Sequence, residues 1–318
     1  MRLSAIIAVA VTLLALPVRA ETPPAFTSPQ ERDHPLVGHI WRPATQSFLS
    51  PQSLAEQAEK ADIVLLGETH DNADHHALQA WMVRRLMETP IKPLLAFEMF
   101  DAAQAPALET YLSTHPRDAD GLAAAVEWEK SGWPDWRMYR PIAQAALNGG
   151  AVLAAANLSR DDTKIIAKGN IPPAWTGKLG LEKPQDPADR QAMEEDIQAG
   201  HCNMLPARAL PAMVRVQRGR DAAMAWTLSQ SPRSVLIAGA GHVRADRAVP
   251  RHLAEMAPGR NVLTIAFIEV VADKTDPAAY AATYETDRLP FDAVWFTPRA
   301  EREDQCEAFR QHMDKKKD

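Results

Sequence analysis

Two short motifs in this sequence place a histidine three residues after a glycine, each at the end of an apolar run. Gly67–His70 reads Gly-Glu-Thr-His, and Gly239–His242 reads Gly-Ala-Gly-His. Glycine permits a tight exit from a strand and a close approach of the backbone to a ligand. Imidazole is a common metal ligand and the usual proton carrier near neutral pH. We interpret the two motifs as candidate halves of one site.

Polar groups at other run ends extend this candidate site. Glu68 and His70 lie two residues apart, so in extended geometry they face the same side. Glu98 ends the apolar run 93–98, and Asn157 closes the run 151–156. Ionisable groups at the end of a buried strand are costly unless they have partners. The alternative is a set of plain strand–helix turns with polar caps.

These residue types are compatible with two kinds of ligand. His70, His242 and Glu68, with Glu98 nearby, could hold a divalent metal ion. The same groups could hold a porphyrin carboxylate or an organic cofactor. The candidate ligand-binding residues are Gly67, Glu68, His70, Glu98, Tyr139, Asn157, Arg220, Gly239 and His242.

Aromatic and charged residues outside the motifs have competing interpretations. Trp128, Trp133 and Trp136 precede Tyr139 and either pin a loop to the core or form a wall for a flat ligand. Tyr139 could then supply a phenolate oxygen to ferric haem. Arg220 lies within a predicted helix beside an aspartate. Arg220 either pairs locally on a solvent-exposed helix face or points inward to balance the strand-end carboxylates.

The remaining histidines are interpreted as ordinary surface residues. His75 and His76 are adjacent and cannot share one helix face, so we expect solvated positions at a helix start. The same expectation applies to His201 and His252.

Alternating strand and helix patterns must position the candidate site. Apolar runs predict strands at 61–66, 93–98, 151–156, 234–238, 261–268 and 290–296, after an extended segment at 38–48. Helical patterns cover 74–87, 102–113, 119–128, 139–148, 247–257 and a long region, 191–229, broken near Pro206 and Pro211. Residues 169–190 are rich in proline and predict a loop. This order predicts an α/β fold: a mainly parallel sheet, covered by helices on both faces, with a helical insertion. Ligands bind beyond the carboxyl ends of such strands, where the two motifs, Glu98 and Asn157 fall.

The N-terminus has the features of a secretory signal peptide. Arg2 precedes an apolar stretch at 5–16, and Val18-Arg19-Ala20 offers small residues for cleavage. The stretch is short for a membrane anchor, which is the alternative. We expect residues 1–20 to be removed, 21–39 to form a leader loop, 40–306 a single domain and 307–318 a charged tail. The protein would then be periplasmic or otherwise exported, and soluble after cleavage.

Composition excludes one class of partner and allows a disulfide. The formal net charge is −6, and it becomes −8 when residues 1–20, with two arginines and no acid, are removed. An acidic chain without a long basic run is a poor nucleic-acid binder. Cys202 and Cys306 could form a disulfide in an exported protein, worth about 4–5 kcal/mol on a chain-entropy model. Two buried thiols, or a metal pair formed by Cys202 with His201, are the alternatives.

The ordered set of motifs resembles a known family. The segments in question are Val64–Asn72, Phe97–Phe100, the block from Trp133 through Tyr139 to Pro141, Ala156-Asn157, Gln217–Asp221 with Met224-Ala225, and Ala238–His242. Together they resemble the ChaN-type haem-binding uptake proteins of the Tiki/TraB/ChaN/erythromycin-esterase superfamily, over residues 40–306. The superfamily pattern of two Gly-x-x-His motifs, a Glu and an Arg maps onto Gly67–His70, Gly239–His242, Glu98 and Arg220.

The resemblance implies haem or iron acquisition in the envelope. In the ChaN branch haem is held between two subunits, which implies a haem-linked homodimer and an envelope transport partner. In the Tiki branch the same pattern supports metal-dependent peptide hydrolysis. The chain lacks the lipidation cysteine of ChaN-type lipoproteins, so the resemblance does not extend to a lipid anchor.

Three functions follow, in this order. The first is a non-enzymatic haem-binding protein. The second is a divalent-metal-dependent hydrolase that uses Glu68, His70, Glu98 and His242, with a metal-bound water as nucleophile. The third is an envelope interaction protein whose polar strand ends have no ligand. No His-Glu-x-x-His and no Gly-x-Ser-x-Gly occurs in the sequence, which argues against a zincin and against an α/β serine hydrolase.

Overall fold

The computed structural model describes residues 21–304, 306–307 and 310. The predicted signal peptide, and all of the predicted charged tail except Glu307 and Arg310, therefore lie outside the described residues. Within the described part, no helix is long and apolar enough to cross a membrane.

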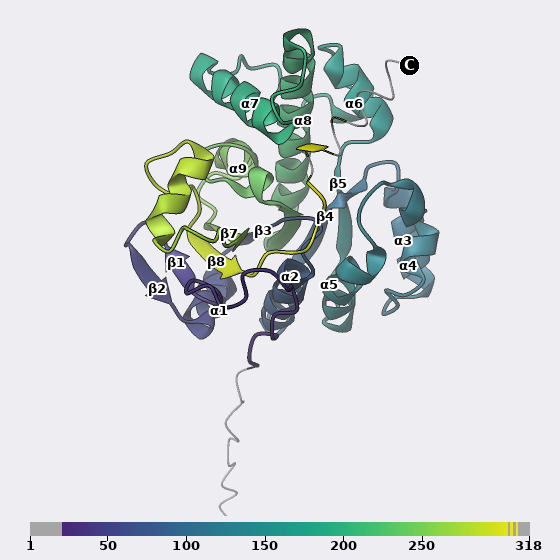
Figure 1. Ribbon diagram of the computed structural model, residues 1–318. Coiled ribbons are helices and arrows are strands. Elements are labelled where there is room, and N and C mark those ends of the chain that lie inside the picture. Colours follow the sequence, from purple (N-terminus) through teal and green to yellow (C-terminus); the bar gives the residue numbers. More distant parts are fainter. Residues whose placement is uncertain (1–20, 305, 308–309, 311–318) are drawn as a thin grey trace, which may run out of the picture.

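A single eight-stranded sheet forms the centre of the described chain (Figure 1). Its strand order is β2-β1-β8-β7-β3-β6-β4-β5, parallel throughout from β8 to β5, with β1 and β2 added antiparallel at one edge. The strands are β1 (Ile40–Arg42), β2 (Ser47–Leu49), β3 (Ile63–Glu68), β4 (Leu94–Asp101), β5 (Leu153–Asn157), β6 (Ser234–Gly239), β7 (Val262–Glu269) and β8 (Ala293–Thr297). The predicted α/β class and mainly parallel sheet are confirmed.

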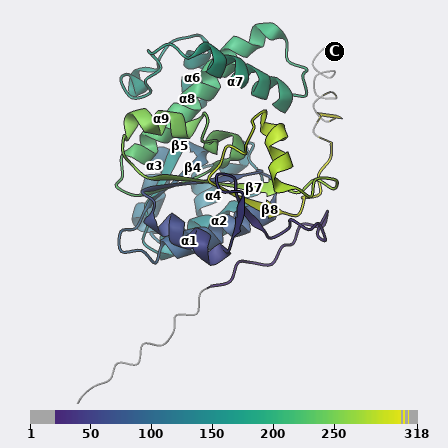
Figure 2. The same cartoon turned by 90° about the vertical axis from the view of Figure 1, so that its left-hand side faces the viewer.

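Helices cover both faces of this sheet (Figure 2). The α-helices are α1 (Pro51–Lys60), α2 (Ala73–Leu86), α3 (Ala105–Thr114), α4 (Leu122–Ala125), α5 (Trp136–Asn148), α6 (Arg160–Ala167), α7 (Pro187–Gly200), α8 (Leu210–Ser229) and α9 (Val249–Met256). Short 3-10 helices are η1 (Trp128–Lys130), η2 (Pro173–Trp175), η3 (Ala207–Ala209), η4 (Ala240–Val243) and η5 (Pro277–Tyr284). α1, α2 and α5 bury residues such as Leu54, Trp81 and Ile142 in one core, and α8 and α9 bury Met224 and Leu253 in the other.

Two helices were not predicted, and one is shorter than expected. α1 buries only Leu54, Ala55 and Ala58, and α6 buries only Ile166, so neither has a wide apolar stripe. Both begin at serine caps, whose side chains accept a backbone N–H in the first turn. The predicted helix 119–128 is reduced to α4 and η1. The predicted break in 191–229 is confirmed, since α7 ends at Gly200 and α8 begins just before Pro211.

The four strands that end at the candidate residues are consecutive neighbours, in the order β3-β6-β4-β5. Parallel pairing places Glu68 opposite Gly239, and Asp101 opposite Asn157. The register of β4 on β5 shifts between Phe97 and Asp101, so the strand is irregular where it carries Glu98. Such irregularities commonly re-aim a side chain at a strand end. The sheet thus brings four segments that are distant in sequence to one edge.

Cys202 and Cys306 form a disulfide between residues 104 positions apart. The predicted bridge is confirmed, and it excludes the alternative of a metal pair between Cys202 and His201. The bridge connects the end of α7 with the segment that follows β8. α7 lies in the helical insertion, which is the part of the chain between β5 and β6.

Candidate functional site

The two glycine–histidine motifs meet at the carboxyl edge of the sheet, because their strands are direct neighbours. A side chain at Gly67 would meet the Val243 side chain at 2.4 Å and the Ala240 backbone at 2.9 Å. A Cβ on Gly239 would lie 3.0 Å from Nε2 of His70. Each glycine is therefore required by close packing against the other motif, and the two motifs lie side by side at one edge of the sheet, as predicted.

Glu68 is a buried carboxylate surrounded by donors. Its Oε1 accepts hydrogen bonds from Nδ1 of His70 at 2.9 Å and from the Tyr139 hydroxyl at 2.8 Å. Its Oε2 lies 3.2 Å from Nδ1 of His76. Burial alone would raise the pKa of Glu68, but His76 and then His70 outweigh it and hold that pKa well below its usual value. Glu68 is therefore an anion that fixes the ring of His70.

His75 and His76 contradict the expectation of solvated histidines, because both are buried in α2. His76 faces Glu68, and its Nε2 donates to the carbonyl of His70 at 3.0 Å. His75 accepts the Thr69 N–H at Nδ1 and contacts the Thr297 hydroxyl at Nε2. Burial lowers the pKa of His75 to about 3, which keeps it neutral. The helix start carries these residues into the core because α2 packs directly over the first motif.

Glu98 forms a second buried group with His242. Its Oε1 lies 3.2 Å from Nε2 of His242, and its Oε2 accepts the Gly239 N–H at 2.8 Å. On the other side of the ring, Nδ1 of His242 lies 2.5 Å from Oδ1 of Asp221. Burial alone would lower the pKa of His242, but Glu98 and Asp221 raise it to about 10. Burial likewise opposes ionisation of Glu98, yet His242 and His70 lower its pKa to about 2.

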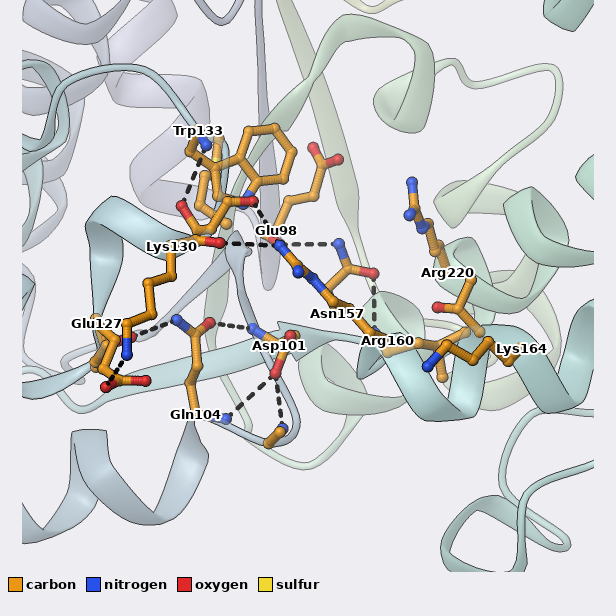
Figure 3. Close-up of a pocket in the computed structure, with 16 residues that line it drawn as sticks. Glu98, Asp101, Gln104, Glu127, Lys130, Trp133, Asn157, Arg160, Lys164 and Arg220 are labelled. Atoms are coloured by element: carbon orange, nitrogen blue, oxygen red, sulfur yellow. Dashed lines mark hydrogen bonds and ion pairs between the residues drawn. The ribbon is translucent and has the colours of Figure 1, made fainter. Parts of the chain in front are cut away.

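A cavity of about 650 Å³ opens beside Glu98 and Asn157 (Figure 3). In this view the Glu98 carboxylate lies between the indole of Trp133 and the guanidinium of Arg220. Asn157 is positioned by its own hydrogen bonds: its side chain donates to the Glu98 carbonyl and accepts the Leu158 N–H. The charged side chains that line the cavity are four cations, Lys130, Arg160, Lys164 and Arg220, and three carboxylates, Glu98, Asp101 and Glu127.

Arg220 lines the same cavity as Glu98, and Asp221 is fully buried against His242. Arg220 therefore faces the cavity, as the inward interpretation expects, but among the described residues it forms no ion pair with Glu68 or Glu98. Nε of Arg220 is buried and has no hydrogen-bond partner among the described residues. A guanidinium with free donors at a cavity wall suits an anionic ligand group.

The aromatic cluster divides into a packed part and an open part. Trp128 and Trp136 are buried against each other and against Phe100. Trp133 lines the cavity, with its ring centroid 4.9 Å from that of His70. Tyr139 has no exposed surface, and both burial and Glu68 raise the pKa of its phenol. In this position Tyr139 supports Glu68 and does not face the open edge.

Among the described residues, no group of three or more His, Cys, Asp or Glu is arranged to hold a metal ion. The histidines and carboxylates are instead paired with each other. One nitrogen is different: Nε2 of His70 makes no hydrogen bond within the described residues, and the His70 side chain is 36% exposed. Burial alone would lower the pKa of His70, but Glu68 and Glu98 raise it.

Sequence reasoning missed several participants. Asp221 and His76 complete the two buried groups, and Lys130, Arg160 and Lys164 add charge to the cavity. The adjacent histidines just after the first motif were an available signal for His76. No local pattern marks Asp221 or the cavity lysines, because their role depends on how α6 and α8 cross the strand ends.

The contact between Gly239 and His70 predicts the effect of adding one methyl group. Gly239→Ala should displace the His70 ring and destabilise the fold by about 1–3 kcal/mol, the usual cost of overpacking. Gly241→Ala is the matched control, since a Cβ there meets nothing within 4 Å. Chemical denaturation of both variants tests this, and equal stabilities would contradict the packing argument.

The raised pKa of His242 predicts a specific loss of stability at alkaline pH. A raised folded-state pKa gives stabilisation that is complete below the ordinary histidine value, about 6.5, and is lost as pH rises towards 10. The unfolding free energy of the wild type should therefore fall relative to that of His242→Gln between pH 6.5 and pH 10. Denaturant titrations across that range measure the difference, and parallel profiles would refute the assignment.

Comparison with known proteins agrees with this fold. A search of curated proteins finds no significant match. ChaN of Campylobacter jejuni, in a structure described as showing cofacial heme binding, has a TM-score of 0.64 and 22% identity, covering 80% of this chain and 95% of that one. A mutant of the erythromycin esterase EreC in its open conformation has a TM-score of 0.45 and 15% identity, covering 84% and 99%, which is too distant to support an argument.

The family model described as "Haem-binding uptake, Tiki superfamily, ChaN" matches residues 54–253. That range begins in α1 and ends in α9, so it contains both glycine–histidine motifs, Glu98 and Arg220. This chain belongs to the ChaN haem-binding uptake family of the Tiki superfamily.

Proposed function

We propose that this chain is an exported haem-binding protein for haem or iron acquisition, and that the cavity beside Glu98 holds the porphyrin. The observation that carries the proposal is the unengaged Nε2 of His70, whose ring contacts Trp133 in the wall of a cavity that four cationic and three acidic side chains line. The volume of about 650 Å³ lies within the usual range of cofactor pockets. Membership of the ChaN family supports the choice of haem as the ligand.

The residues present fit a haem group in two ways. Haem carries an iron that needs an axial donor and two carboxylates that need cations. Nδ1 of His70 is held by Glu68, which leaves Nε2 as the donor, the usual arrangement for a ligating histidine. The guanidinium of Arg220, with Lys130 and Arg160 in the same cavity wall, suits the carboxylates. Trp133 offers an aromatic surface beside His70.

In this proposal His70, and not Tyr139 or His242, would hold the iron. Both nitrogens of His242 are engaged by carboxylates, at 2.5 Å and 3.2 Å. The Tyr139 hydroxyl is used by Glu68, and the ring is fully buried. Bound haem would supply an iron centre for storage or transfer. Glu98 would stay paired with His242 at the cavity wall.

Haemin and metal-free protoporphyrin separate the two proposed contacts. Both ligands carry the carboxylates, but only haemin carries iron. His70→Ala should weaken haemin binding about tenfold or more, or about 1.4 kcal/mol, and shift the Soret band, while leaving protoporphyrin binding unchanged. Arg220→Gln should weaken both ligands. His115→Ala, an exposed histidine far from the cavity, is the control.

Absorption and tryptophan-quenching titrations of the purified protein measure these affinities. Absence of a Soret shift at stoichiometric haemin would remove the proposed function. Equal loss of both ligands in His70→Ala would remove His70 as the iron ligand and leave the cavity assignment in place.

Cofacial binding, as described for the Campylobacter jejuni protein, suggests that two copies of this chain face each other across their ligands. We propose a haem-linked homodimer that delivers its ligand to a transport partner in the envelope. Light scattering after size-exclusion chromatography should give a monomer mass without haemin and a dimer mass with it. A mass that does not change with haemin would contradict the dimer.

Processing of the N-terminus belongs to the same proposal. An exported protein should lose residues 1–20 and begin at Glu21, and the disulfide fits an oxidising compartment.

A further inference from the structure

The segment after β8 contacts the first histidine motif and then joins the helical insertion. We define the C-terminal strap as residues 298–304 with Cys306. In Figure 1 this yellow part of the chain leaves β8 and runs towards α8. Its end is held by the disulfide to Cys202, just after α7. The strap thus connects two regions that the sheet does not bring together.

Arg302 contacts the turn just after the first motif, where the Pro298 carbonyl of the strap also accepts a hydrogen bond from the Asn72 amide. Nε and Nη2 of Arg302 donate to the two oxygens of Asp71, each at 2.7 Å. Its Nη1 and Nη2 donate to the two oxygens of Glu269 at 2.7 Å and 2.6 Å. Both contacts are bidentate, the geometry that only a guanidinium provides. Asp71 is the residue directly after His70.

Glu269 extends this contact to the rest of the turn. It accepts the Asn72 amide at 2.7 Å and the Ala300 N–H at 3.0 Å. Asn72 in turn caps α2 by accepting the N–H groups of Asp74 and His75. Two successive residues after His70 are therefore held by one network that ends on Arg302. The turn that carries His70 has its support on the side away from the cavity.

The strap depends on the disulfide for its position. Glu301, Glu303 and Asp304 are exposed and bury little surface. An exposed segment near a chain end is poorly ordered unless it is tied down. The bridge to Cys202 supplies that tie, and both cysteines are partly exposed. A cavity of about 400 Å³ lined by Arg302 and Cys306 gives a small thiol access to the bridge.

We propose that Arg302 is a positioning residue for His70, and that the Cys202–Cys306 disulfide keeps it in place. This inference rests on the proposed haem-binding function and adds a redox control of the same site. A dithiol attacks the bridge, forms a mixed disulfide and then closes on itself. The two electrons and two protons of the dithiol pass to Cys202 and Cys306, which become thiols. The strap is released, Arg302 leaves Asp71, and the His70 turn loosens.

The test compares the strap variants in two independent measurements. Hydrogen–deuterium exchange of the apo protein reports the order of residues 69–72, and haemin titration reports affinity. Arg302→Gln should speed exchange there and weaken haemin binding about 10–100-fold, the usual effect of removing a partner that orients a ligand. Arg302→Lys should have intermediate effects on exchange and affinity, because lysine keeps the positive charge but cannot form the bidentate contacts of a guanidinium. Arg299→Gln, an exposed strap residue that contacts Gln30 and not the turn, is the matched control.

Reduction of the folded wild type with dithiothreitol should reproduce the Arg302→Gln result and add little in the Arg302→Gln variant, since both act through one contact. The double variant Cys202→Ser/Cys306→Ser checks that dithiothreitol acts only on this bridge. Unchanged exchange at 69–72 in both reduced wild type and Arg302→Gln would overturn the proposal. If the wild type binds no haemin, the proposed haem-binding function is wrong. The exchange measurement would still show whether Arg302 orders residues 69–72.

Discussion

Two carboxylates buried at neighbouring strand ends impose the constraint on which the rest of this site depends. Glu68 is 2% exposed and Glu98 is 3% exposed, and both are anions. An uncompensated charge in such a position costs several kcal/mol. Each must therefore be matched by cations and hydrogen-bond donors in contact with it. His70, His76 and the Tyr139 hydroxyl supply these for Glu68, and His242 with the Gly239 N–H supplies them for Glu98.

This compensation leaves two kinds of group in the site: groups that are already paired with each other, and groups that remain free to bind a ligand. The buried pairs contact each other without a ligand, although Oε2 of Glu68, Nδ1 of His76 and Oδ2 of Asp221 lack a hydrogen bond among the described residues. The groups left over are Nε2 of His70, the Trp133 ring and the guanidinium of Arg220. Trp133 and Arg220 line the cavity, and His70 contacts Trp133. A preorganised floor with a few unengaged groups above it is a common form of ligand site.

Ion pairs between arginines and carboxylates also hold both histidine turns in place. The turn after His242 carries Arg244 and Arg247, which pair with Asp196 on α7. The turn after His70 is held through Asp71 by Arg302. The helical insertion contributes to both supports, directly through Asp196 and through the disulfide at Cys202. Its position in the fold thus has a physical reason connected with the site.

Local sequence patterns predicted the layered fold well and the margins of the site poorly. The strand segments are long and apolar, so the sequence predicts their positions and the mainly parallel direction of the strands. α1 and α6 were not predicted, although both are amphipathic and both begin at a serine cap that the sequence shows. The adjacency of His75 and His76 at a helix start predicts solvent-exposed positions for both, and this prediction is wrong because α2 buries them. In the structure the charge of Glu68 makes a buried position favourable for His76.

By itself, the sequence determined the α/β order of elements, the glycine–histidine turns at strand ends and the availability of a disulfide. These depend on residue types and on spacings of a few positions, which local chemistry controls. Only the tertiary structure decided which partners each charged group has. Asp221 meets His242 because α8 crosses the end of β6, and Arg302 meets Asp71 across 231 positions of sequence because the strap passes over the first motif. Those pairings depend on where distant elements cross, and no local spacing records that.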